Sequence, residues 1–166
     1  MILCLETNKR ARTDCVYVNE TIRNFYDLDD IKLSWIYMNS KTKFDAKDVC
    51  RDIKTKVTMY KHGKTQVIYC VDTDDFEINM EHRKAMEKID QFCRKNAYEL
   101  IWFCHDVEEV YLGERVSDDV KVREAEKFKR SKKIESVLPV NLTQPKEKKC
   151  SSNIMTVLDK YLSRKK

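Results

Sequence analysis

Four short apolar runs, rich in β-branched and aromatic residues, divide the first two thirds of the chain. They cover residues 1–5, 32–38, 66–71 and 98–104. Runs of this length and composition predict buried strands. Between them lie segments with apolar residues at the three- to four-residue spacing of amphipathic helices. These segments are residues 13–27, 44–60 and 78–95. The alternation predicts an α/β fold with a mostly parallel four-stranded sheet flanked by helices.

The last part of the chain has a different pattern. Residues 120–137 form a strongly basic helical segment, and residues 139–145 begin and end with proline, which predicts a loop. An apolar stripe over residues 153–162 predicts a final helix that docks on the domain, with a partner interface as the alternative. We therefore expect an α/β domain over residues 1–119 and a basic helical extension over residues 120–166, packed on the same domain.

Composition narrows the class of protein. The 166 residues are 42% hydrophobic and 37% charged, and no stretch approaches the ~20 apolar residues that a membrane span needs. The basic residues of the N-terminus follow its apolar run, the reverse of a secretory signal. Seven dispersed cysteines form no C-x-x-C pair, which favours a reducing compartment and lacks the spacing of a zinc site. We expect a cytoplasmic protein with no membrane partner.

The net charge of +5 conceals a segregation of charge along the chain. Residues 72–119 carry 14 acidic and 6 basic side chains, whereas the remainder carries 27 basic and 14 acidic side chains. An acidic centre within a basic frame suits an enzyme that binds a cation and attracts a polyanion such as nucleic acid. The alternative for any single charge run is a solvated helix face.

An acidic cluster directly follows the third apolar run. Asp72, Asp74 and Asp75 come after residues 66–71, and open α/β sheets bind ligands at the carboxyl ends of their strands. The spacing of Asp72 and Asp74 places both side chains on one side of an extended strand. Glu6 ends the first apolar run and should reach the same edge. These residues predict a divalent cation site with oxygen ligands; the alternative is an aspartate-rich turn that caps the next helix.

The segment after the fourth apolar run offers further candidates. Glu108, or less favourably Glu109, supplies another carboxylate, and His105 supplies a proton shuttle. In the alternative interpretation Asp106 caps a helix, and the two glutamates simply favour the first turn of that helix.

Two basic segments are candidates for phosphate contact. Lys9, Arg10 and Arg12 occupy the loop after Glu6, where a helix N-terminus adds to their attraction for phosphate; a solvated surface loop is the alternative. The basic helical segment carries a local charge of +5 between residues 121 and 133, and it could follow a nucleic-acid backbone. Its residues predicted to contact nucleic acid are Lys127, Arg130, Lys132 and Lys133.

The order of these features resembles a Toprim domain, the α/β catalytic fold of topoisomerases, bacterial primases and OLD-type nucleases. That family has a glutamate at the end of its first strand, matched here by Glu6, and a D-x-D motif at the end of a later strand, matched by Asp72 and Asp74. The layout is also similar to small RloB-like Toprim proteins of defence and mobile-element loci, which carry an acidic motif after the fourth strand, matched by Asp106 and Glu108. A glycine usually follows the family glutamate, whereas this chain has a threonine.

The resemblance implies a nuclease that hydrolyses phosphodiester bonds of DNA or RNA with Mg²⁺ or Mn²⁺. The implied catalytic residues are Glu6, Asp72 and Asp74. The implied metal ligands are Glu6, Asp72, Asp74, Asp75 and Glu108. A companion ATPase is also implied as a partner.

Two alternatives remain open. One is a catalytically inactive Toprim-like module that binds nucleic acid or a partner protein. The other is a receiver-like phosphorelay domain with Asp72 as phosphoacceptor, although a lysine at the end of a following strand is missing.

Overall fold

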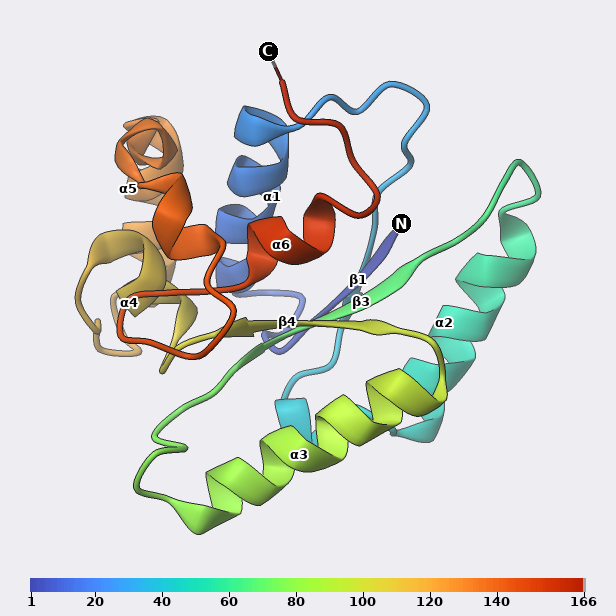
Figure 1. Ribbon diagram of the computed structural model, residues 1–166, viewed down its shortest axis with the longest axis horizontal. Helices are drawn as coiled ribbons and strands as arrows, with labels where there is room; N and C mark the ends of the chain where they lie inside the picture. The colour runs from blue at the N-terminus through green and yellow to red at the C-terminus, as the bar shows by residue number, and fades with distance from the viewer. Residues whose placement is uncertain (166) are drawn as a thin grey trace.

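The central sheet has four parallel strands in the order β2-β1-β3-β4 (Figure 1). The computed structural model describes residues 1–165. The strands are β1 (Ile2–Leu5), β2 (Ser34–Tyr37), β3 (Val67–Asp72) and β4 (Glu99–Phe103). Each lies within a predicted apolar run or within one residue of it. The predicted four-stranded α/β fold is confirmed, and because every strand pair is parallel, all carboxyl ends meet at one edge of the sheet.

Helices cover both faces of the sheet (Figure 1). One face packs against α1 (Thr13–Phe25), α4 (Val107–Leu112), α5 (Lys121–Arg130) and α6 (Ile154–Leu158). The other face packs against α2 (Lys47–Met59) and α3 (Met80–Lys95). Alternate strand residues divide between the two cores: Leu3 and Ile68 belong to the first, Ile2 and Tyr69 to the second. This division explains why the strands are almost continuously apolar in sequence.

Two C-terminal helices are shorter than the sequence predicts. The basic segment predicted over residues 120–137 is helical only to Arg130, because Lys132 adopts a left-handed backbone with φ 51° before the 3₁₀ turn η2 (Lys133–Ser136). A second 3₁₀ turn, η3 (Pro139–Leu142), occupies the predicted loop. The final helix ends at Leu158 rather than 162, since the chain beyond it pairs with the end of α1: the Asp27 amide donates to the Ser163 carbonyl at 2.9 Å.

The C-terminal extension shares the core of the α/β domain. Phe128 of α5 packs on Tyr17 of α1 with ring centroids 4.9 Å apart. Asn153 covers the outer edge of β4: it accepts a hydrogen bond from the Trp102 amide at 2.9 Å and donates one to the Leu100 carbonyl at 3.0 Å. These side-chain bonds satisfy an edge strand that would otherwise present unpaired backbone groups.

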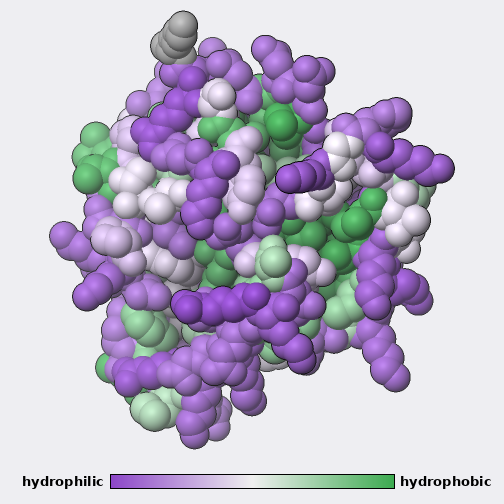
Figure 2. Space-filling model, turned by 45° about the vertical axis from the view of Figure 1, so that its right-hand side comes forward, coloured by the Kyte–Doolittle hydropathy of each residue, from purple (hydrophilic) through white to green (hydrophobic). Residues whose placement is uncertain are grey.

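Charged side chains dominate the surface. Figure 2 shows hydrophilic residues over most of one face, with apolar residues visible in the hollows between them. None of the described helices combines the length and the apolar character needed to cross a bilayer. All seven cysteines are free thiols.

Candidate functional site

Carboxylates from different elements meet at the carboxyl edge of the sheet. Glu6 follows β1, Asp72 is the last residue of β3, and Asp14 lies in the first turn of α1. They line a pocket of about 310 Å³. The other lining residues are Thr7, Asn8, Ala11, Thr13, Asp118, Lys121 and Val122. The structure therefore brings Glu6 and Asp72 together, as the sequence predicts, and adds Asp14. We call this set of three carboxylates the acidic pocket.

Burial is the largest cause of a raised pKa at each of the three carboxylates of the acidic pocket. Burial raises the pKa of Asp72 well above its usual value, and the charges of Asp14 and Glu6 add to the effect. Burial, followed by the charge of Glu6, raises the pKa of Asp14 to about 7. Burial also raises the pKa of Glu6. Within residues 1–165, no basic side chain forms an ion pair within 4.0 Å of these carboxylates. The pocket thus concentrates negative charge without an internal counterion in direct contact.

Asp14 is a site residue outside the set of carboxylates predicted from the sequence. It does not cap α1, because the N-cap position is Arg12 and carries no side-chain cap bond. Instead the buried Asp14 carboxylate accepts hydrogen bonds from the Thr7 amide at 3.1 Å and from the Thr13 hydroxyl at 3.3 Å. The available signal was its position in the first turn of a helix that begins at the sheet's carboxyl edge.

Glu108 lies near the acidic pocket but does not line it. Its side chain is 1% exposed, and neither carboxylate oxygen has a hydrogen-bond partner. The nearest cation is Lys121, whose Nζ lies 3.4 Å from Oε2. Burial raises the pKa of Glu108, with Lys121 opposing the shift. Its charge adds to the raised pKa of both Asp14 and Asp72.

The remaining acids of the motif have other partners. β3 ends at Asp72, and Asp74 has a left-handed backbone with φ 51°, so the strand alternation does not continue to Asp74. The Asp74 carboxylate forms an ion pair with the buried Lys41, whose Nζ also donates to the Asp72 carbonyl at 2.7 Å. Asp75 accepts a hydrogen bond from Arg115 at 2.6 Å, which lowers the pKa of Asp75. Neither Asp74 nor Asp75 lines the acidic pocket; their role as metal ligands stays a prediction.

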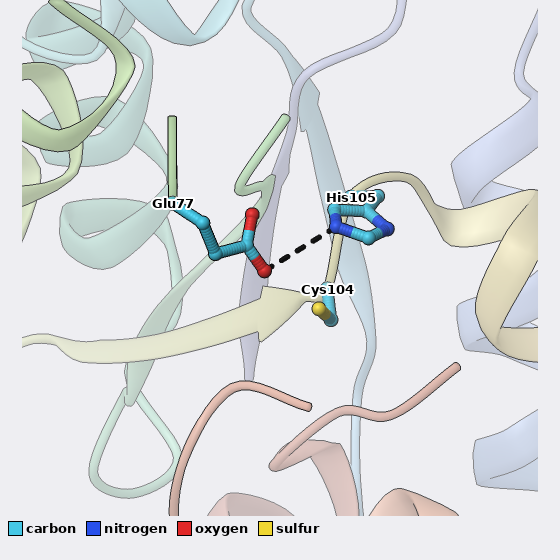
Figure 3. Close-up of side chains that lie close together, drawn as sticks. All are labelled: Glu77, Cys104 and His105. Carbon is cyan, nitrogen blue, oxygen red and sulfur yellow. Dashed lines mark ion pairs between the residues drawn. The ribbon is translucent and has the colours of Figure 1, made fainter. Parts of the chain in front are cut away.

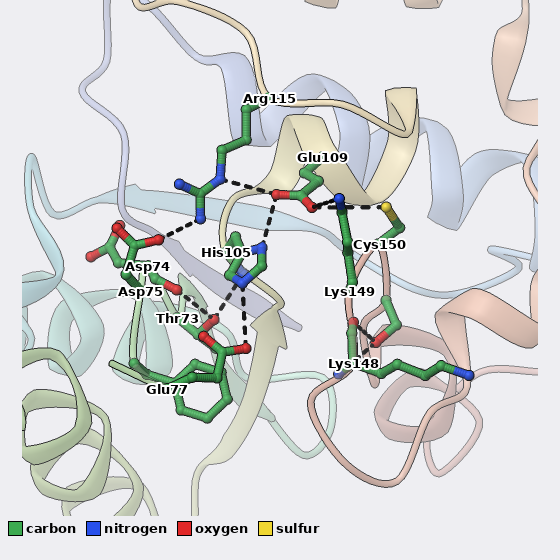
Figure 4. Close-up of polar contacts among 12 residues, drawn as sticks. Thr73, Asp74, Asp75, Glu77, His105, Glu109, Arg115, Lys148, Lys149 and Cys150 are labelled. Atoms are coloured by element: carbon green, nitrogen blue, oxygen red, sulfur yellow. Dashed lines mark hydrogen bonds and ion pairs between the residues drawn. The ribbon is translucent and has the colours of Figure 1, made fainter. Parts of the chain in front are cut away.

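His105 lies between the carboxylates of Glu109 and Glu77 (Figure 4). Its Nδ1 is 2.9 Å from Glu109 Oε2, and its Nε2 is 3.3 Å from Glu77 Oε1. Asp106 caps α4, accepting a hydrogen bond from the Glu109 amide at 2.7 Å, which confirms the predicted helix cap at Asp106.

One group could hold a metal ion with little rearrangement. The ligand atoms of Glu77, Cys104 and His105 all lie within 4.8 Å of one another (Figure 3). Within residues 1–165 no other trio of histidine, cysteine, aspartate or glutamate meets this limit. The ligand atoms of the acidic pocket are therefore more widely spaced than those of this group.

The predicted phosphate-binding residues lie at two distances from the acidic pocket. Lys9, Arg10 and Arg12 are exposed on the loop that also contributes Thr7 and Asn8 to the pocket wall. Lys121 lines the pocket, but the predicted contact residues of the C-terminal extension lie farther along the chain from it. The helical rise places Arg130 about 14 Å along α5 from Lys121. These exposed residues are Lys127, Arg130, Lys132 and Lys133.

Comparison with known proteins returned no match. No family model, no curated protein and no solved structure matches this chain. The function is therefore argued from the geometry of the site.

Proposed function

We propose that the acidic pocket binds a divalent cation, Mg²⁺ or Mn²⁺, and that the protein hydrolyses phosphodiester bonds of DNA or RNA. The observation that carries this proposal is the set of carboxylates Glu6, Asp14 and Asp72 in one pocket without a directly paired base. Ionised carboxylates in such a setting are costly unless a cation offsets their charge. A bound cation would relieve this cost and favour the ionised form of the carboxylates that coordinate it.

The donor set favours Mg²⁺ or Mn²⁺ over a softer metal. All three side chains offer oxygen, the ligand that these cations prefer. Mg²⁺ usually keeps several of its waters and binds proteins through only one or two carboxylates. A pocket of about 310 Å³ with separated carboxylates suits such a hydrated ion.

The surrounding residues support phosphate chemistry. When bound, the cation supplies Lewis-acid stabilisation of the charge that develops on a scissile phosphate. Glu6 has a raised pKa, so it is suited to exchange a proton with the attacking water or the leaving oxygen. The exposed Lys9 and Arg10 stand beside the pocket and neutralise the approaching backbone.

A cleavage assay tests this proposal. Wild-type protein is incubated with single- and double-stranded DNA and RNA, with Mg²⁺, with Mn²⁺ or with chelator. We expect metal-dependent cleavage of at least one substrate and a loss of at least 100-fold in Asp72→Asn. The matched control is Asp90→Asn on α3, whose carboxylate pairs with Arg94 away from the pocket. Cleavage that persists in chelator or in Asp72→Asn contradicts the proposal.

A second candidate is a binding module without catalysis. The observation that favours it is Lys41, whose buried ammonium already neutralises Asp74 and contacts the backbone of Asp72. In that case nucleic acid binds without cleavage in the presence of Mg²⁺, and binding is unchanged in Asp72→Asn. The same set of substrates, measured by binding and by cleavage, separates the two functions.

A further inference from the structure

We propose that Glu77, Cys104 and His105 form a binding site for a transition-metal ion of the Zn²⁺ class, distinct from the acidic pocket. Glu77 comes from the segment between β3 and α3, and the other two residues directly follow β4. Figure 3 shows the three side chains close together, and their ligand atoms lie within 4.8 Å of one another. None of the three residues lines the acidic pocket.

The distances agree with zinc geometry. Tetrahedral zinc with bonds of about 2.0–2.2 Å to nitrogen and oxygen holds two such ligands about 3.3–3.5 Å apart. His105 Nε2 and Glu77 Oε1 are 3.3 Å apart. The Cys104 Sγ lies within 4.8 Å of one ligand atom of each of the other two residues, whereas zinc requires a separation of about 3.6 Å. A movement of about 1 Å that brings the three ligand atoms closer together completes the site. The Glu77 side chain is exposed, so it is free to make this movement.

His105 is held in the orientation that metal-bound histidines adopt. Its Nδ1 faces Glu109 Oε2 at 2.9 Å, and the Arg115 Nε fixes the same oxygen at 3.1 Å (Figure 4). The backbone of His105 is fixed as well, because its amide donates to the Thr73 hydroxyl at 2.8 Å. A carboxylate on one ring nitrogen sets the tautomer and directs the other nitrogen at the metal.

The contact of Nδ1 with Glu109 leaves Nε2 of His105 facing Glu77. When Nδ1 donates to Glu109, a neutral imidazole presents the lone pair of Nε2 to the Glu77 carboxylate at 3.3 Å. Two acceptors cannot face each other at this distance without a cation between them or a proton on the nitrogen. A metal ion resolves the contact and also engages the buried thiol of Cys104, which a protonated imidazole does not.

The donor set selects the class of metal. One sulfur, one nitrogen and one oxygen suit Zn²⁺ or Co²⁺ and disfavour Mg²⁺. Burial, followed by the charges of Glu77 and Glu109, raises the pKa of Cys104 to about 12, so the metal displaces a thiol proton on binding. Three protein ligands leave a fourth position for water or substrate, on the side where Glu77 is exposed to solvent.

Cobalt spectroscopy tests the site on the whole protein. After chelator treatment and buffer exchange, reduced protein is titrated with Co²⁺, which reports thiolate ligation through a near-ultraviolet charge-transfer band. We expect a band that saturates at one Co²⁺ per chain and disappears on addition of Zn²⁺. Cys104→Ala should abolish it, whereas Cys93→Ala, which removes a buried cysteine of α3, and Asp72→Asn should retain it.

A second variant keeps the test decisive if Cys104→Ala fails to fold. Glu77 is exposed, so Glu77→Gln should fold and should weaken Co²⁺ affinity at least tenfold. The proposal is overturned if wild-type protein gives no thiolate band, if the band persists in Cys104→Ala, or if Co²⁺ affinity is unchanged in Glu77→Gln.

Discussion

The buried ammonium of Lys41 forms an ion pair with the carboxylate of Asp74. This pair divides the D-x-D motif, because Asp74 has an internal cation as partner while Asp72 contributes to the acidic pocket. Lys41 also lowers the pKa of Glu6, although burial outweighs this effect. The lysine thus influences both stability and the affinity of the pocket for cations.

Replacing Lys41 should separate these two effects. Lys41→Met leaves Asp74 without its partner, so we expect the free energy of unfolding in chelator to fall by about 1–3 kcal/mol. Removal of a positive charge near Glu6 should also tighten Mn²⁺ binding. Chemical denaturation with and without Mn²⁺ measures both. The control is Lys43→Met, at an exposed residue of the 3₁₀ turn η1 (Lys41–Lys43), which also contains Lys41. This variant should change neither quantity. A similar decrease in the free energy of unfolding of both variants would contradict this role for Lys41.

The raised pKa of Asp14 predicts a pH dependence of stability. In the folded state the pKa is about 7, above the usual value of 3.8, so the folded protein binds the proton more tightly than the unfolded chain does. Protonated Asp14 therefore contributes to the free energy of unfolding. This contribution is complete below about pH 4 and is lost as pH rises through about 7. In chelator, Asp14→Asn should be less sensitive to pH between 5 and 8 than wild type.

Asp14→Asn should also be more stable than wild type at pH 8 by at least about 1 kcal/mol, which raises Tm by about 2–4 °C. Melting curves at pH 5 and pH 8 test this expectation. Asp90→Asn, outside the pocket, should have the pH dependence of wild type. Equal pH dependence of stability in Asp14→Asn and wild type would contradict a raised pKa of Asp14 in the folded protein.

The C-terminal extension should be required for stability. Phe128 is 1% exposed and packs on Tyr17 and Tyr111. Phe128→Ala should lower the free energy of unfolding by about 3–5 kcal/mol. Val140, which is 59% exposed, provides the control, since Val140→Ala should change stability by less than about 0.5 kcal/mol. A small effect of Phe128→Ala would show that the extension is dispensable for the fold.

The basic loop should contribute to nucleic-acid affinity by binding phosphates. Lys9→Ala/Arg10→Ala should weaken binding about equally for all sequences and reduce the slope of log K against log salt by about 2, since each of the two side chains neutralises one phosphate. Lys88→Ala, an exposed position on α3, should leave the slope unchanged. An unaltered slope in the loop variant would place the binding surface elsewhere, with the basic residues near the end of α5 as the next candidates.

The fold could be predicted from the sequence because apolar runs and helical periodicity are local signals. The early end of the basic helix could not be predicted, because it depends on the left-handed backbone of Lys132. The sequence has no glycine or proline there to indicate a helix end. The expected alternation of Asp72 and Asp74 assumed an extended strand, but the strand ends at Asp72. Tertiary hydrogen bonds determine this ending: the Asp74 amide donates to the His105 carbonyl at 2.9 Å.

Only some residues of the acidic pocket could be predicted, because the others are brought there by the tertiary structure. Glu6 and Asp72 follow strands, so the rule for parallel sheets places them at one edge. Lys41 and Asp14 reach that edge from a 3₁₀ turn and a helix, where no simple spacing connects them to the strand ends. Glu77 and Cys104 are likewise separated by a helix and a strand, so their convergence becomes visible only in three dimensions.

The most direct test of the acidic pocket is a thermal-shift titration with Mg²⁺ and Mn²⁺ on wild type, Asp72→Asn, Asp14→Asn and Asp90→Asn. A cation that binds only the folded protein stabilises it by about 2.7 kcal/mol at 100 times its Kd. We predict a saturable rise in Tm for wild type and Asp90→Asn, and a much smaller rise for the two pocket variants. A metal-induced change in Tm that is absent in wild type, or equal in all four proteins, would contradict the existence of a cation site in this pocket.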